Sequence, residues 1–342
     1  MKRLFIVFGI LLFAAAGLSA QIDFDYDVFG DAFEDFASEI STTLPSTAAV
    51  AGLNWSPAYI GEFPHFGVGL SVGAFTIPYD FIEPLVNDLG LSLPSEFDYV
   101  EKWGMPIPAY AFDARIGGFA LPFDIGLKFG YLPDALRDKL GKINADYLLA
   151  GGDVRFRMVE GRGLLPTVSV GGGYTYLKGS VGIPDIATGS KTIGLPNVAP
   201  LVAPYELTVT SPELTFAMQT STFVGKLQAS WDLKVLTPHL GIGAAYGLSS
   251  AGGGLSSDVL YNGAPMSATD IENIKDVLAT YGYTVDELDN TGISIGSDAN
   301  GYSFWVYGGT AINIVFISID LSAMYNLVSS SYGGAVNVRI QL

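Results

Sequence analysis

The sequence predicts an all-β protein, a transmembrane antiparallel β-barrel of about 12 strands. Hydrophobic residues make up 49% of the 342 residues and charged residues only 15%, a balance closer to that of membrane proteins than of soluble ones. After the N-terminal apolar run, no segment offers the roughly eighteen consecutive apolar residues that a membrane helix needs. Several segments instead alternate with the period of a strand. Because a bilayer admits only helices and closed barrels, these observations together favour a barrel.

The chain begins with a predicted secretory signal peptide over residues 1–20. Lys2 and Arg3 precede an uncharged apolar run over 4–16, and small residues lead to a cleavage site after Ala20. The apolar run is too short to span a bilayer as a helix. We therefore expect an exported protein whose folded part begins after this site.

Residues 21–45 are predicted to form a short N-terminal helical segment. Its apolar residues recur at helical spacing, with acidic residues on the other side: Phe29, Phe33, Phe36 and Ile40. The segment either plugs the barrel or forms a solvated helix outside it. The barrel is expected over residues 46–342, with small helical elements in its loops, as at 268–278.

From residue 46 onward, the apolar period changes from helical to strand-like. In the clearest segment, residues 65–77, Phe66, Val68 and Leu70 alternate with glycine and serine. The pattern gives about 12 strands, within a range of roughly 10–14 because boundaries are poorly defined by sequence. They lie near 47–60, 65–77, 107–118, 120–131, 146–159, 164–178, 205–218, 221–234, 238–249, 302–312, 314–327 and 332–342.

The face opposite the apolar one separates a barrel from a secreted β-sandwich. A sandwich would coat this face with long charged side chains in water, whereas here it is often Gly, Ser or Thr. Small residues mixed with isolated charges are typical of a crowded or water-filled lumen. Aromatic residues near strand ends are consistent with interfacial girdles. They are Trp55, Tyr59, Trp103, Tyr110, Tyr131, Tyr176, Trp231, Tyr246, Trp305 and Tyr325.

Charged residues on the non-apolar face are the candidate lumen-lining residues. They are Asp113, Arg115, Asp124, Lys128, Asp153, Arg155, Arg157, Lys226, Asp232 and Lys234. The first seven fall on one lumenal wall if strands 107–118, 120–131 and 146–159 are neighbours. Such mixed charges either select which solutes pass or pair with one another and fill a narrow barrel. The sequence leaves both interpretations open.

Other chemistry has little support, and no enzymatic activity, cofactor or metal is predicted. Residues 69–73 match the G-x-S-x-G nucleophile pattern, but they lie within a continuous strand instead of at a sharp turn. Neither His65 nor His239 has a catalytic partner at a recognisable spacing. Acidic residues within 23–34 resemble a calcium loop, yet Val28 occupies the position that requires glycine.

The net charge limits which partners are expected, and the absence of cysteine limits how the fold can be stabilised. The formal net charge of −17 argues against nucleic acid. The chain has no cysteine, so its stability must come from a closed sheet or a large core and not from disulfides. We therefore expect contacts with lipid, or with a small solute, but not with a polyanion.

The C-terminal strand at 332–342 gives the most specific signal for location. One of its faces holds Val336, Val338, Ile340 and Leu342. The strand resembles the terminal strand by which outer-membrane barrels are recognised by their assembly machinery, although such signals more often end in Phe. The expected partners are therefore outer-membrane lipid and the barrel-assembly machinery.

Five short pieces follow one another between residues 50 and 250. They are Leu53-Asn54-Trp55, His65-Phe66-Gly67-Val68, Met105-Pro106-Ile107-Pro108, Phe129-Gly130-Tyr131-Leu132-Pro133 and Leu240-Gly241-Ile242-Gly243-Ala244-Ala245-Tyr246. In this order they resemble a family of uncharacterised bacterial outer-membrane barrels of unknown function. An N-terminal segment before the barrel is also similar to long-chain fatty-acid transporters, without a specific shared motif. The resemblance implies a fold and a location, and it supplies no catalytic residue.

The leading functional prediction is a non-enzymatic outer-membrane channel or transporter for a small solute, with residues 21–45 as a candidate plug. The alternative is a structural or surface-interaction barrel with a closed lumen. A continuous polar path through the lumen would favour transport, and an interior filled with side chains would favour the alternative.

Overall fold

The structure is a computed structural model. It describes residues 38, 40, 41, 43–50, 55, 57–61, 65–81, 83, 102–118, 121–137, 144–183, 191–195, 205–261, 264, 265, 267, 269, 272, 287–289 and 292–341. The predicted signal peptide, the calcium-like acidic stretch, most of the predicted helical segment 21–45, the helical loop element 268–278 and Leu342 fall largely or wholly outside these residues. Within them, no helix is long and apolar enough to cross a membrane.

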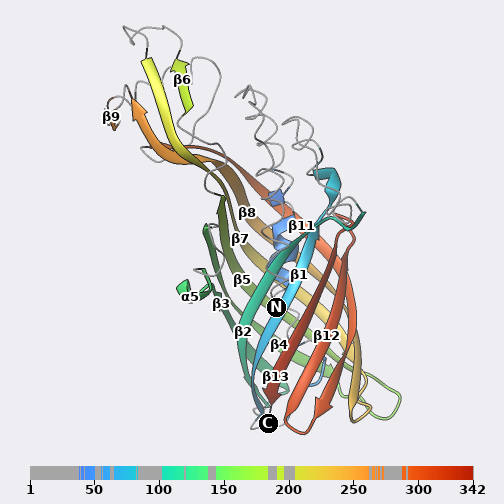
Figure 1. The fold of residues 1–342 in the computed structure, drawn as a ribbon. Coiled ribbons are helices and arrows are strands. Elements are labelled where there is room, and N and C mark those ends of the chain that lie inside the picture. Colours follow the sequence, from blue (N-terminus) through green and yellow to red (C-terminus); the bar gives the residue numbers. More distant parts are fainter. Residues whose placement is uncertain are drawn as a thin grey trace.

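Ten antiparallel strands of the described chain close into a barrel (Figure 1). Neighbours in sequence pair with each other, β13 pairs with β1, and β11 pairs with both β8 and β12, so the ring has no open edge. The strands are β1 (His65–Ile77), β2 (Met105–Gly117), β3 (Phe123–Tyr131), β4 (Asn144–Val159), β5 (Thr167–Ile183), β7 (Tyr205–Ser230), β8 (Leu236–Tyr261), β11 (Gly292–Ile314), β12 (Ile317–Asn326) and β13 (Tyr332–Gln341).

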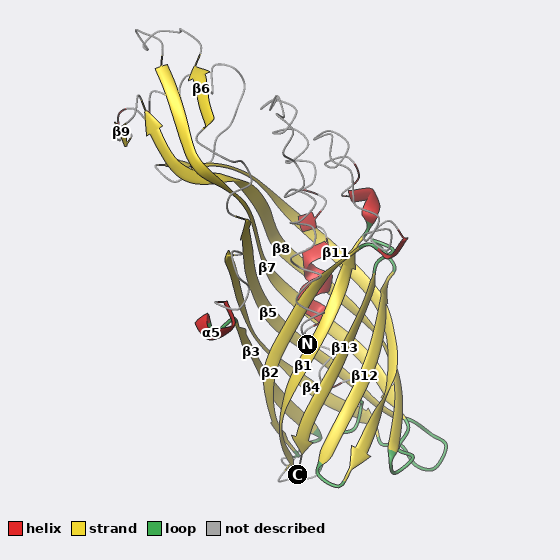
Figure 2. Cartoon of the chain, in the orientation of Figure 1, coloured by secondary structure: helices red, strands yellow, loops and turns green. Residues whose placement is uncertain are grey.

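Short elements add to this ring. Strands β6 (Lys191–Leu195), β9 (Ala264–Pro265) and β10 (Glu287–Asp289) pair with the far ends of β7, β8 and β11. The short helices η2 (Tyr79–Phe81) and α5 (Asp134–Arg137) follow β1 and β3. Figure 2 shows that these additions lie at one end of the barrel or on its outside.

The barrel has ten strands and not about twelve, for two reasons. The predicted strand at 47–60 is wrong, because residues 43–50 are helical and 57–61 form no strand. The predicted strands at 205–218 and 221–234 are one strand, β7, with a bulge between Thr210 and Glu213. The ladders from β7 to β5 and to β8 run without a break through residues 218–221, so the turn predicted there is wrong.

Exposed and buried side chains alternate along the wall strands where the structure describes their burial. In β1, Phe66, Val68 and Leu70 are exposed outward, while His65 and Ser71 are buried inward. The same alternation runs through β3, β12 and β13. A strand exposes successive residues on opposite faces, so this confirms the predicted orientation of the apolar series.

Aromatic side chains border the apolar outer band at one end. Tyr174, Phe223, Tyr246 and Tyr302 form one continuous cross-strand row on β5, β7, β8 and β11. Neighbouring rings in this row are in contact, with centroids 5.2 Å apart for Tyr174–Phe223 and 4.8 Å apart for Tyr246–Tyr302. By contrast, Trp55 and Trp305, which the sequence suggested for a girdle, are 3% and 2% exposed and lie inside the barrel.

Connection length separates the two barrel ends. The connections at 118–122, 160–166, 231–235 and 315–316 are short and lie at the end where the C-terminus lies (Figure 1). Most connections at the other end are long, as at 78–104 and 184–204. At that end β7, β8 and β11 also run on beyond the other strands as a sheet extension, which we define as residues 205–215, 252–261 and 292–300 with β6, β9 and β10.

The chain before β1 occupies the lumen. Residues 43–50 form a helix inside the barrel (Figure 2), and Leu44, Ala48 and Val50 on it are fully buried. One side of the helix packs with Phe75, Trp305, Tyr307 and Met324, and the other with Ala109, Ala111, Leu149 and Leu177. These inward apolar residues from the upper wall provide the core that a barrel of small interior residues otherwise lacks.

Candidate functional site

The lower half of the lumen, toward the end of the barrel where the C-terminus lies, contains a network of charged side chains held by three adjacent strands. Arg115 on β2, Gly126 on β3 and Asp153 on β4 lie in one cross-strand row. A Cβ atom at Gly126 would come within 2.4 Å of an Arg115 nitrogen and 3.0 Å of an Asp153 oxygen. The glycine therefore leaves the space in which Arg115 reaches Asp153 across the middle strand, at 2.5 Å.

Asp124 is the centre of this network. Its two carboxylate oxygens accept hydrogen bonds from Arg115 and Arg155, and Arg155 Nε donates to it at 3.0 Å. Asp124 and Arg155 are fully buried, and Arg115 nearly so. Buried charges of this kind persist only when they are paired and hydrogen-bonded, and here each carboxylate oxygen faces a guanidinium.

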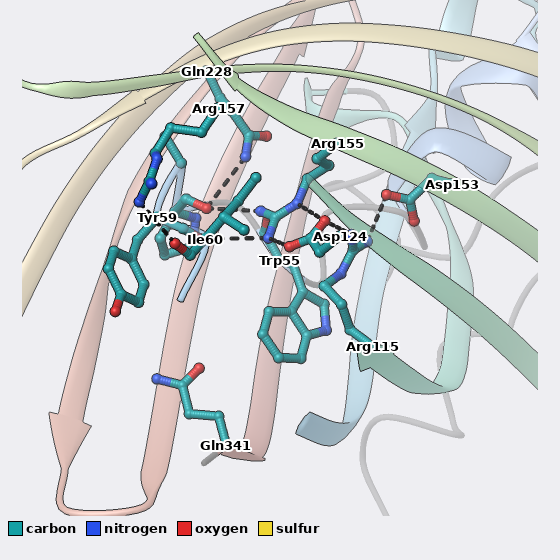
Figure 3. A network of polar contacts seen from close by, with 12 residues as sticks. Trp55, Tyr59, Ile60, Arg115, Asp124, Asp153, Arg155, Arg157, Gln228 and Gln341 are labelled. Carbon is teal, nitrogen blue, oxygen red and sulfur yellow. Dashed lines mark hydrogen bonds and ion pairs between the residues drawn. The ribbon is translucent and has the colours of Figure 1, made fainter. Parts of the chain in front are cut away.

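The network also holds the segment before β1, by donating hydrogen bonds to the backbone carbonyls of that segment (Figure 3). Arg155 Nη1 donates to the carbonyls of Trp55 and Pro57 at 2.9 and 2.8 Å. Arg157 Nη1 donates to the carbonyl of Ile60 at 3.0 Å, and Gln228 Nε2 donates to that of Pro57 at 3.2 Å. Residues 57–61 form no strand or helix that would satisfy the carbonyls of Pro57 and Ile60, so the wall satisfies them instead.

Trp55 links the first charge network to a second one on the adjoining wall, which β2, β13 and β12 form on either side of β1 and beyond it. Its indole N–H donates to Asp113, and the Arg339 guanidinium lies 4.8 Å from its ring centroid, a cation–π distance. Asp113 also accepts from Asn337 Nδ2 at 3.1 Å. Beyond Arg339 lies a fully buried pair in which His239 Nε2 is 2.9 Å from Asp320.

The helical part of the segment is tied to the upper wall by hydroxyl and amide groups. Ser46 Oγ lies 2.5 Å from Ser303 Oγ on β11, and Asn326 Nδ2 on β12 donates to Ser46 Oγ at 2.5 Å. We call the described residues of this lumenal segment, between 43 and 61, the plug. It is held at its upper end by Ser46 and at its lower end by the carbonyls that Arg155 and Arg157 bind.

Eight of the ten predicted lumen-lining residues lie on the inner wall. Arg115, Asp124, Asp153 and Arg155 are in contact with one another, and Arg157 contacts the plug. Asp113, Lys128 and Lys226 line the lumen beside them. Asp232 and Lys234 do not, because β7 ends at Ser230 and both residues are exposed in the turn before β8. The prediction extended the strand past its end.

Sequence reasoning missed four lumenal groups: Trp55, His239, Asp320 and Arg339. Strand parity identifies the last two, because Asp320 and Arg339 lie on the non-apolar faces of β12 and β13. Trp55 could not have been found in this way, since it belongs to no strand. Its place depends on the plug, which only the folded barrel reveals.

The described part of the lumen is densely packed with side chains. Every one of the ten wall strands contributes an inward side chain that is almost completely buried: Ser71, Asp113, Asp124, Arg155, Thr175, Gln228, His239, Tyr307, Asp320 and Asn337. A small recess beside Ala49 leaves room for roughly one water molecule. Of the two interpretations of the charged face, the geometry fits side chains that pair with one another and fill the barrel.

No nucleophile arrangement forms from the histidines of the described wall. His65 and Ser71 both lie in the extended strand β1, six residues apart, which places them about 20 Å from each other. The His65 ring packs edge-on against Trp55 and Tyr59, with centroids 6.0 and 6.2 Å away. His239 lies against Asp320 and Tyr307 in the lumen. Both histidines therefore have packing partners inside the barrel.

Comparisons with known proteins identify no family. No family model matches the chain, and no curated protein matches it.

Among solved structures, it is similar to the translocator domain of the autotransporter NalP from Neisseria meningitidis, at 10% identity and a TM-score of 0.34, covering 93% of this chain and 100% of that one. It is also similar to the toluene transporter TbuX of Ralstonia pickettii, at 11% identity, TM-score 0.24, and 85% and 92% coverage. A third is a FadL homologue of Pseudomonas aeruginosa, at 9% identity, TM-score 0.26, and 92% and 97% coverage. The weak similarity to transporter barrels that the sequence suggested is thus found. At sequence identities this low, the activity of those proteins cannot be transferred to this chain.

Proposed function

We propose that this chain is an outer-membrane barrel with a permanently closed lumen, which presents its sheet extension beyond the membrane for contact with an external partner. The observation that carries this proposal is a difference in strand length. Strands β7 and β8 have 26 residues each and β11 has 23, whereas β12 and β13 have 10. A membrane-spanning strand needs about 9–11 residues, so β7 and β8 each have about 15 residues, or about 50 Å of strand length, more than the crossing requires.

The outer surface supports the membrane location. On β11, exposed apolar residues run from Tyr302 to Ile314, and polar residues, among them Asp298 and Asn300, are exposed above Tyr302. At about 3.3 Å per residue and a tilt of about 40°, these twelve steps span about 30 Å, close to the height of a lipid-facing band. The aromatic row through Tyr302 lies at the upper limit of this band, where an interface would be.

The connections give the orientation. Outer-membrane barrels usually keep short turns on the periplasmic side and long loops outside. By this rule the C-terminal end of the barrel faces the periplasm and the sheet extension faces outward. Outer-membrane lipid would contact the apolar band, and the barrel-assembly machinery would recognise β13, whose outward Val336, Val338 and Ile340 face lipid. We assign no enzymatic activity, and no nucleic-acid partner.

Single-cysteine labelling tests the proposal, because the chain has no cysteine of its own. Asn300→Cys lies on the exposed face of the extension, and Leu164→Cys lies in a short turn where the native side chain is 92% exposed. In intact Gram-negative cells, a membrane-impermeant maleimide should label Asn300→Cys at once and Leu164→Cys only after lysis. Equal labelling of both variants, or the reverse order, would show that the proposed location or orientation is wrong.

A solute transporter with a movable plug is the second candidate. It is favoured by one observation: the hydrogen-bonded ring of ten strands closes by itself, and the plug takes no part in it. The two candidates differ in planar bilayers. The closed barrel should stay silent when folded protein is demonstrably inserted, and so should a variant in which the plug is fixed to the wall. Conductance that appears in the unmodified protein and disappears when the plug is fixed would support the transporter.

A further inference from the structure

A small recess lies between the plug helix and the wall formed by β3, β4, β5, β7 and β11. Its polar lining comes from Lys128, Asp153, Thr175 and Lys226, and its apolar lining from Ala49, Val224 and Trp305. Backbone at Gly152, Gly172 and Gly173 completes it. The space holds roughly one water molecule, so any occupant is small.

Glycines in neighbouring strands position the two lysines. A Cβ atom at Gly151 would come within 2.8 Å of Lys128 Cε, and one at Gly171 would lie 3.6 Å from Lys226 Cε. Because these positions carry no side chain, the lysine stems lie across the neighbouring strand and extend into the interior. The glycine-rich stretches of β4 and β5 thus make room for ammonium groups that the inner wall could not otherwise hold.

Two hydrogen-bond donors at the recess have no acceptor. Lys128 is 9% exposed, and among the described residues its ammonium has no hydrogen bond or ion pair. Trp305 is 2% exposed, and its indole N–H likewise has no partner. Its ring lies over Gly243, in the same cross-strand row as Lys226. An ammonium and an indole N–H can only donate, so an occupant that satisfies both must accept.

The charges on the described inner wall also favour an anion as the occupant, because positive side chains outnumber negative ones. The described inner wall holds six cationic side chains: Arg115, Lys128, Arg155, Arg157, Lys226 and Arg339. It holds four carboxylates: Asp113, Asp124, Asp153 and Asp320. The one described carboxylate that lines the recess, Asp153, forms an ion pair with Arg115, so Lys128 and Lys226 share with that arginine the attraction of this carboxylate. Among the described residues this leaves two positive charges in excess, and a bound anion would offset them.

We propose that the recess is a binding site for a small inorganic anion of halide size, held by Lys128, Lys226 and the indole N–H of Trp305. The anion would offset the excess positive charge and accept the two free hydrogen bonds. Because Ala49 of the plug lines the same recess, the bound anion would also stabilise the plug against the wall. A neutral water molecule could accept the hydrogen bonds but would leave the charge uncompensated.

The test measures thermal unfolding of the refolded protein while sodium gluconate is replaced by sodium bromide at constant ionic strength. A ligand that binds only the folded state raises the unfolding midpoint with a saturable dependence on concentration. We expect such a rise for the unmodified protein and its loss in Lys128→Met. The control Lys234→Met removes the same charge from an exposed turn and should keep the full rise.

A rise of equal size in all three proteins, or one that never saturates, would show a bulk salt effect and overturn the proposal, as would no rise at all. Lys128→Met removes no hydrogen bond from the described structure, so it should fold. If it does not, anomalous scattering from bromide in crystals of the unmodified protein decides. A bromide peak at the recess supports the site, and a map without one rejects it.

Discussion

The hydroxyl of Tyr147 bonds to both backbone groups of Tyr110. It accepts a hydrogen bond from the Tyr110 amide at 3.0 Å and donates one to the Tyr110 carbonyl at 2.8 Å, and the two rings stack with centroids 4.6 Å apart. Strand β3 pairs with β2 only from Phe112 to Gly117, so residues 105–111 of β2 have no ladder partner on that side. The Tyr147 side chain on β4 therefore replaces a missing strand at this point of the wall.

Tyr147→Phe should destabilise the barrel by about 1–3 kcal/mol, because two backbone groups in the wall lose their partner while the ring stack remains. Tyr131→Phe is the matched control, since Tyr131 is exposed on the outer face. Denaturant unfolding of the two refolded variants measures the difference. Equal free energies of unfolding would mean that the Tyr110 backbone is satisfied in another way.

Asp124→Asn should destabilise the barrel by about 3–5 kcal/mol, the usual cost of removing one partner of a buried ion pair. The substitution leaves the Arg115 and Arg155 guanidinium groups without their shared carboxylate. Asp146→Asn also breaks an arginine contact, with Arg137, but that pair is exposed and should contribute only about 0–1 kcal/mol. Similar losses in both variants would contradict the central place of Asp124.

Gly243→Ala should destabilise the barrel by about 1–3 kcal/mol, because the new methyl group would lie 2.3 Å from atoms of the Trp305 ring. A rigid indole in a packed lumen has no alternative position, so its fluorescence should change as well. Gly225→Ala serves as the control, since nothing lies within 4 Å of its Cβ position. Unfolding curves and tryptophan emission, recorded together, check both expectations.

Ser46→Cys combined with Ser303→Cys should form a disulfide between plug and wall. The two hydroxyl oxygens are 2.5 Å apart, and a disulfide needs sulfur atoms about 2.05 Å apart. The oxidised variant should migrate differently from its reduced form on denaturing gels, whereas neither single variant should show this shift. A double variant that folds but stays reduced would indicate that the helix does not lie against β11. The same variant provides the fixed plug for the conductance comparison.

The sequence predicted the class of fold and most of one charged wall, because a strand places alternate residues on opposite faces whatever its neighbours are. Runs such as Phe66, Val68 and Leu70 identified the outward-facing side, and the same parity placed Arg115, Asp124 and Arg155 inward. Strand number was less accurate, because a helical period near residue 47 resembles a strand over a short window. The weakly patterned segment 205–218 was also separated from 221–234, with which it forms the single strand β7. Asp232 and Lys234 were misplaced because strand ends are set by turn geometry.

What the sequence by itself determined is therefore the two-faced wall, which depends on local alternation alone. What only the tertiary structure decided is the content of the lumen. The plug contacts residues up to 280 positions away, as between Ser46 and Asn326. The local periodicity of apolar residues in the sequence contains no information about such a distant contact. Whether charged inner residues leave a pore or fill it depends on how ten strands curve around one segment, because only that curvature brings Arg155 to the carbonyls of Trp55 and Pro57.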